Sequence, residues 1–66
     1  MTMDRRRQIL DAALVSFLEK GYAATSIADI RARSGASTGS IYHFFSGKGA
    51  LAEALLREAI AGWAGL

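Results

Sequence analysis

Glycine-centred breaks interrupt a chain that otherwise favours helix, and this pattern restricts the possible folds more than any other feature. The 66 residues include thirteen alanines and no proline, and no stretch of five or more alternates like a strand. Alanine has the highest intrinsic helix propensity and proline the lowest. Breaks at Gly21, Gly35 and Gly47 leave four short segments. The sequence therefore predicts an all-α fold in one small domain.

The segment 4–20 has the apolar spacing of an amphipathic helix. Its apolar residues recur at steps of three and four, which places them on one helical face. Asp4 and Lys20 suit the two ends of the helix dipole, and Gly21 stands where a left-handed C′ residue is expected. The predicted inward face consists of Ile9, Leu10, Ala13, Leu14, Phe17 and Leu18.

Two shorter helices are expected next, separated by a tight break. Ser26 and Asp29 fit a relaxed capping box for the first of them, although Thr25 fits the N-cap equally well. Ser37 is a natural N-cap for the second, which is predicted from 38 to about 45. A pair of helices joined by about three residues around a glycine makes a helix-turn-helix. The second helix of such a pair can lie in the major groove of DNA.

The predicted helix over 38–45 has two different sides. Ile41 shares a packing face with Phe44 and Phe45. The outer side carries groups that hydrogen-bond to phosphates or base edges, namely Thr38, Ser40, Tyr42 and His43. Gly39 lets the helix N-terminus, whose free N–H groups favour a phosphate, approach another surface closely. Core packing is the alternative explanation for the whole Tyr-His-Phe-Phe run.

A fourth helix is expected from Lys48 onward. A cation at this end opposes the helix dipole, so an external phosphate explains Lys48 better than helix stability does. We divide the chain into a DNA-binding domain, 1–47, and a connecting helix, 48–66. The apolar stripe of that helix is Leu51, Leu55, Leu56, Ala59, Ile60 and Trp63.

The net charge of +2 is unevenly distributed, with +3 over residues 1–48 and −1 over residues 49–66. A basic first part suits an anionic partner. The run Arg5 to Arg7 is either a phosphate-contacting arm or a solvated helix start. No apolar run reaches the roughly 18 residues of a membrane span, and the N-terminus makes a poor signal peptide. We therefore expect a cytoplasmic protein.

The residues needed for catalysis or metal binding are missing from the sequence. Without cysteine, the chain forms neither a disulfide nor a thiolate metal site. The single histidine, His43, has no neighbouring ligands, and no acidic residue is placed to orient it with Ser37 or Ser40 as a nucleophile. We therefore predict no enzyme activity, no catalytic residues, no metal and no cofactor.

Taken together, these residues resemble the DNA-binding domain of the tetracycline-repressor (TetR) family. The resemblance covers about residues 6–56 and rests on positions that agree in order and spacing without a gap. These are Phe17, Gly21, Tyr22, Thr25, Ser26, Ile27, Ile30, Gly35, Ser37, Gly39, Ile41, Tyr42, His43, Phe45, Lys48 and Leu51.

The resemblance implies a three-helix, homeodomain-like domain with a helix-turn-helix over 26–45, followed by the start of a fourth helix. It implies that Thr25 caps the second helix and touches phosphate, and that Tyr42 and Lys48 contact the DNA backbone. The third helix would lie in the major groove. With the residues singled out above, the predicted DNA-binding set is Thr25, Ser26, Arg31, Ser37, Thr38, Gly39, Ser40, Tyr42, His43 and Lys48.

The chain departs from the family pattern at Arg31, Ser34, Ala36, Thr38, Gly47 and Gly49. Arg31 replaces a usual alanine, and either reaches outward to a phosphate or loosens the packing of the second and third helices. Thr38 replaces a residue that is often basic, so this contact is expected to be neutral. The two glycines around Lys48 replace capping and acidic residues, which predicts a frayed first turn of the fourth helix.

The resemblance also implies a longer protein. Family members carry a second, helical domain that binds a small ligand and forms the dimer. We therefore expect an N-terminal portion of a ligand-responsive repressor that binds a palindromic operator as a homodimer. The alternative is a small helical protein-interaction module that uses Leu55, Ile60 and Trp63. The sequence leaves open the operator, the effector, the regulated genes, and whether the protein represses or activates.

Overall fold

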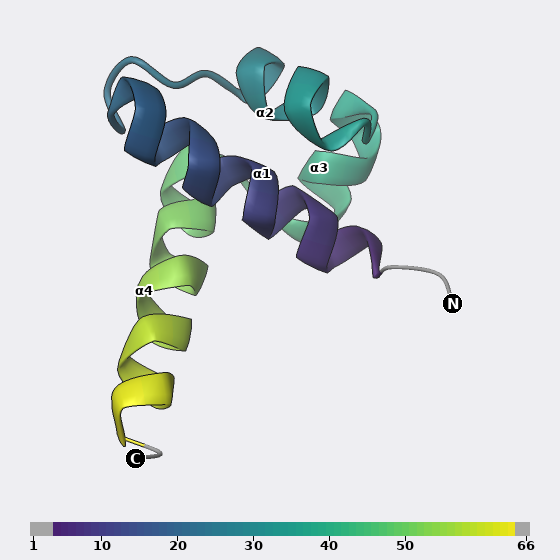
Figure 1. Cartoon of the computed structure of the whole chain (residues 1–66). Coiled ribbons are helices and arrows are strands. Elements are labelled where there is room, and N and C mark those ends of the chain that lie inside the picture. Colours follow the sequence, from purple (N-terminus) through teal and green to yellow (C-terminus); the bar gives the residue numbers. More distant parts are fainter. Residues whose placement is uncertain (1–3, 65–66) are drawn as a thin grey trace.

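The computed structural model describes residues 4–64, and describes side chains as far as residue 62. Within this range the chain forms four α-helices and no strand. They are α1 (Arg5–Lys20), α2 (Ile27–Ser34), α3 (Thr38–Phe44) and α4 (Lys48–Ala64). The all-α prediction is confirmed, and each predicted helix boundary lies within a residue or two of the observed one. Figure 1 shows α2 and α3 at one side of α1, and α4 extending away from these three helices.

Capping residues define where the helices begin. The Asp4 side chain accepts a hydrogen bond from the Arg6 N–H at 3.3 Å, which caps α1. Ser26 rather than Thr25 caps α2, because the reciprocal bonds of the capping box join Ser26 and Asp29. The Ser37 hydroxyl accepts the Ser40 N–H at 3.1 Å and caps α3, as predicted.

The ends of α1 and α2 use glycine in two conformations. Gly35 has φ 77° and ψ −1°, the left-handed conformation in which a Cβ is unfavourable. Gly21 also has a positive φ, 88°, but its ψ of 154° lies outside the left-handed helical region that we predicted. Its N–H still closes α1 by donating to the Phe17 carbonyl oxygen at 2.8 Å.

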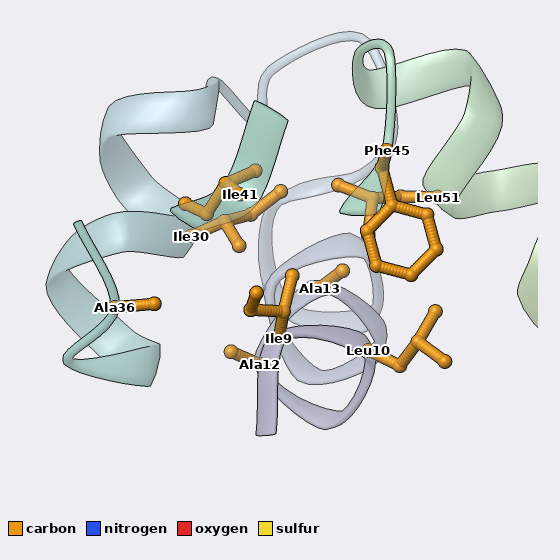
Figure 2. Packing of buried hydrophobic residues seen from close by; sticks show 9 residues of the cluster. All are labelled: Ile9, Leu10, Ala12, Ala13, Ile30, Ala36, Ile41, Phe45 and Leu51. Atoms are coloured by element: carbon orange, nitrogen blue, oxygen red, sulfur yellow. The ribbon is translucent and has the colours of Figure 1, made fainter. Parts of the chain in front are cut away.

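All four helices contribute to one small core (Figure 2). Its buried members are Ile9, Leu10, Ala12, Ala13, Ile30, Ala36, Ile41, Phe45 and Leu51. The prediction for Leu14 and Leu18 is wrong, since these side chains are 43% and 77% exposed. Ala12 and Ser16 are buried instead. The α1 face against α2 therefore includes small side chains, which allow the two helices to approach closely.

As far as residue 62, the apolar packing of α4 on the other helices is confined to its first part. Leu51 is fully buried and Leu55 is half-buried, as the predicted stripe requires. Leu56 and Ile60, from the same predicted stripe, are 61% and 58% exposed. The side chain of Trp63 lies outside the described residues. Among the described helices, none is long and apolar enough to cross a membrane.

The first turn of α4 is closed, in contrast to the predicted fraying. The Leu51 N–H donates to the Gly47 carbonyl oxygen at 3.2 Å. Because Leu51 is also fixed in the core, packing secures the start of the helix although Gly47 offers no capping side chain.

Candidate nucleic-acid interface

A three-residue turn joins α2 to α3 and is fixed by local hydrogen bonds. The Gly35 N–H donates to the Arg31 carbonyl oxygen at 3.0 Å. The Ala36 N–H donates to the Ser34 hydroxyl at 3.1 Å, which gives a physical reason for a serine where the resemblance led us to expect alanine. Ala36 itself is buried, and it anchors the turn between the two helices.

The packing side of α3 is formed by Ile41 and by Phe45, which directly follows the helix; they are 0% and 6% exposed. Phe44 was also predicted on this side, and that prediction is wrong, because its ring is 39% exposed. The Phe44 ring meets the His43 ring edge-on, with 4.9 Å between centroids. This outward aromatic pair could not be predicted from the sequence, since Ile41, Phe44 and Phe45 all fit one helical face.

The outer side of α3 presents the polar groups that the sequence predicted. Thr38, Gly39, Tyr42 and His43 are exposed, and Ser40 is half-buried. Core packing of the Tyr-His-Phe-Phe run is therefore excluded for all but its last residue. The result is a short helix that is held by its apolar side and offers hydroxyls, a phenol and an imidazole to solvent.

Packing within the protein does not explain the glycine at position 39. A Cβ placed on Gly39 would have only the Ser37 hydroxyl oxygen nearby, at 3.9 Å, which is an ordinary contact. The fold therefore has room for a side chain at this position.

The capping box at the start of α2 also fixes the charge of Asp29. The Ser26 N–H donates to one Asp29 carboxylate oxygen at 2.9 Å, and the Lys20 ammonium lies 3.0 Å from the other. The Ser26 backbone bond and then the Lys20 side chain lower the pKa of Asp29 to about 2. Asp29 is thus a carboxylate near neutral pH, and Ser26 stays exposed beside it.

The position of Thr25 does not favour the phosphate contact that was predicted for it. Its side chain is buried, and its hydroxyl donates to the carbonyl oxygens of Ser16 at 3.1 Å and Gly21 at 2.8 Å. Its N–H is bonded to the Tyr22 carbonyl oxygen at 3.2 Å. Both donors of Thr25 are therefore used inside the protein, where they fix the connector between α1 and α2.

Lys48 has internal partners that the sequence did not reveal. Its ammonium donates to the Tyr22 carbonyl oxygen at 2.7 Å and lies 4.2 Å from the centroid of the Tyr22 ring. The carbonyl oxygen and the ring both favour a cation, so they offset the unfavourable dipole at the start of α4. An external phosphate is therefore not needed to explain a lysine at this position.

The arginines divide into exposed and paired groups. Arg31 is exposed on α2, and the structure records no carboxylate paired with it among the described residues. Arg7 bridges Asp11 at 3.0 Å and Glu58 at 2.9 Å. Arg6 lies 4.0 Å from Glu58. Arg6 and Arg7, two of the three basic residues at the start of α1, are thus tied to α4, although their side chains remain partly exposed.

Within the described residues, no cluster of three or more His, Asp or Glu side chains is arranged to hold a metal ion.

Residues 9–55 match the family model described as "Bacterial regulatory proteins, tetR family". The chain is similar to two curated proteins, each called "HTH-type transcriptional regulator BetI", from Escherichia coli (strain K12 / DH10B) and Klebsiella pneumoniae (strain 342). Each is 46% identical over 54 residues, which are 82% of this chain and 28% of the relative. The chain therefore spans less than a third of the length of these relatives. No solved structure matches.

Proposed function

Because the chain belongs to the tetR family of bacterial regulatory proteins, we propose that it binds DNA with α3 in the major groove. Family membership assigns the chain to DNA-binding regulation of transcription. The observation that carries the finer proposal is the division of α3 into a buried apolar side and an exposed polar side. A helix held in this way presents its outer groups to base edges in a fixed orientation.

The exposed and half-buried residues of this face divide into two proposed roles. Ser37, Thr38, Ser40 and His43 are proposed to face the bases, and Gly39 to allow close approach of the backbone. Ser26, Arg31, Tyr42 and Lys48 are proposed to contact phosphates, which would position α3 and carry no sequence information. Thr25 is proposed only as an internal support for the connector, since its donors are already bonded. The DNA-binding unit remains residues 1–47.

The regulatory part of the proposal concerns the longer protein implied by the relatives. We propose a cytoplasmic bacterial repressor that binds a palindromic operator as a homodimer and releases it when a small effector binds to a second domain. In this mechanism α4 connects the two domains, and its movement changes the spacing of the two α3 helices. Two such helices fit half-sites about one helical turn apart. The packing of Leu51 and Leu55 against the core supports this role, because it links α4 to the domain that carries α3.

A matched pair of charge deletions tests the proposed face. Arg31→Ala removes an exposed cation on α2, whereas Arg57→Ala removes one on α4, where Arg57 pairs with Glu53 at 2.6 Å. Fluorescence anisotropy with duplex DNA at several salt concentrations gives the affinity and its salt dependence. Arg31→Ala is expected to weaken binding to all sequences and lower the salt slope by about one phosphate contact. Arg57→Ala is expected to have little effect, and equal effects of both would contradict the proposed face.

The exposure of Leu56 and Ile60 favours one second candidate, a protein-interaction module that binds a partner helix through α4. Such a module would bind its partner independently of salt and would not bind DNA. Ile60→Ser would then abolish its function, while Arg31→Ala would leave it unchanged.

A further inference from the structure

We infer that Tyr22 is a positioning residue, which holds the Lys48 ammonium at the start of α4 for contact with a DNA phosphate. The inference rests on the proposed function, because it assigns a role within DNA binding. The two residues are 26 positions apart, and the fold brings the connector after α1 against the first turn of α4. The carbonyl oxygen of Tyr22 accepts from the ammonium at 2.7 Å, and its ring centroid lies 4.2 Å from the same nitrogen.

Tyr22 is itself held in place from several sides. Its carbonyl oxygen also accepts the Thr25 N–H at 3.2 Å, which closes the turn before α2. Its ring is tilted against the Phe17 ring, with 5.3 Å between centroids. Thr25 is buried and bonded to the α1 carbonyl of Ser16. The platform beneath the Lys48 ammonium is therefore fixed to α1 and to the start of α2.

While it contacts Tyr22, the Lys48 ammonium can still bind an anion. An ammonium carries three N–H donors, and the Tyr22 carbonyl oxygen takes one of them. A lysine side chain that moves freely loses conformational entropy when it binds a phosphate. If the side chain is already ordered in the free protein, this entropic cost of binding is lower. Tyr22 thus raises DNA affinity through Lys48 without touching DNA.

Three substitutions separate this role from a purely structural one. Tyr22→Leu removes the ring and keeps the carbonyl, and Tyr22→Phe keeps the ring and removes the hydroxyl. Lys48→Met removes the ammonium and keeps an unbranched side chain. Duplex-DNA affinity is measured by anisotropy at several salt concentrations, with unfolding midpoints recorded for every variant. If Tyr22→Leu does not fold, Tyr22→Met gives the same comparison.

We expect Tyr22→Leu to weaken DNA binding by about two- to fivefold, which is the range of one exposed cation–π contact. Tyr22→Phe should restore wild-type affinity. In a Lys48→Met background, Tyr22→Leu should have no further effect. Tyr42→Leu, the same change on α3, should weaken binding in both backgrounds. The Lys48 side-chain protons should show an upfield ring-current shift that Tyr22→Leu abolishes and Tyr22→Phe retains.

The outcomes distinguish a failure of this inference from a failure of the proposed function. If Lys48→Met weakens binding but Tyr22→Leu does not, or if Tyr22→Leu weakens it equally in the Lys48→Met background, Tyr22 is not a positioning residue. If neither Lys48→Met nor Tyr42→Leu changes DNA binding, the proposed DNA-binding face is wrong. A Lys48 ring-current shift together with wild-type affinity for Lys48→Met identifies a clamp within the fold and overturns the inference.

Discussion

Gly35, in the turn before α3, and Gly39, within α3, are explained by different physical requirements. Gly35 has a left-handed conformation, in which a side chain is strained. Gly39 lies in the first turn of α3, and an added Cβ would meet only an ordinary contact with Ser37. The turn therefore requires glycine at position 35. At position 39 the fold does not require it, and the proposed approach to DNA does.

Alanine at these two positions should have opposite effects on stability. Gly35→Ala is expected to lower the free energy of unfolding by about 1 kcal/mol because of its backbone conformation. Gly39→Ala is expected to raise it by up to about 1 kcal/mol, since alanine is the better helix former, while it weakens DNA binding. Urea unfolding and anisotropy measure the two effects. Unchanged DNA affinity in Gly39→Ala would argue against a close approach at this position.

The lowered pKa of Asp29 predicts how the free energy of unfolding depends on pH. Its pKa in the folded chain, about 2, lies below the ordinary value of 3.8. A lowered pKa stabilises the fold above the ordinary value, and this contribution is lost as the pH falls through about 2. Asp29→Asn should therefore be less stable than wild type near neutral pH, and the difference should disappear between about pH 4 and pH 2.

Urea midpoints across this pH range provide the test for Asp29. Lys20→Met is the matched control, because it removes the ion pair and keeps the stronger backbone bond from Ser26. It should reproduce only part of the difference. A gap between wild type and Asp29→Asn that is independent of pH would contradict the assigned cause.

At the scale of the elements, the helix starts were the most predictable features. The caps depend on residues within three positions, so the sequence alone predicts Ser37 and narrows the cap of α2 to Ser26 or Thr25. The buried face of α1 was less predictable. Apolar spacing suggested Leu14 and Leu18, but the neighbours of α1 cover Ala12 and Ser16 instead. The apolar periodicity shows which way a helix faces. The number and placement of the neighbouring helices decide which residues on that side are buried.

The ion cluster between α1 and α4 predicts a salt-dependent contribution to the packing of α4. Glu58 contacts both Arg6 and Arg7, and these groups are substantially exposed. Because Glu58 has two partners, Glu58→Gln should lower the free energy of unfolding by about 0.5–1 kcal/mol at low salt, and the loss should vanish at molar salt.

Glu53→Gln is the control for this cluster, because Glu53 pairs with Arg57 within α4. It should cost only about 0.3–0.5 kcal/mol, as expected for a pair within one helix. Urea unfolding at both salt concentrations makes the comparison. An equal effect of both variants would show that Glu58 does not link α4 to α1.

At the scale of the whole molecule, the sequence predicted the fold class and the family, and most of the exposed groups on α3. It did not predict the contacts that join distant segments. Lys48 meets Tyr22 and Arg7 meets Glu58 only after the helices pack, and no local pattern encodes such pairs. The resemblance implied a phosphate contact for Thr25, and the sequence did not reveal that its hydroxyl bonds to carbonyl oxygens of α1 and of the residue after it.

α4 extends away from the other three helices (Figure 1). The core ends at Leu51 and Leu55, so residues 56–62 are exposed. A DNA-binding unit and a largely solvated helix therefore occupy different parts of the described chain. Measuring which of these two parts contacts DNA therefore decides between the DNA-binding proposal and the protein-interaction alternative.

Whether α3 reads DNA is tested best by titrating the ¹⁵N-labelled chain with duplex DNA and following the amide chemical shifts. We expect the largest changes at residues 37–43, with smaller ones at the starts of α2 and α4. These changes should diminish as the salt concentration rises. Changes centred on Leu56 and Ile60, or no changes at low salt, would contradict the claim that α3 is the DNA-reading helix.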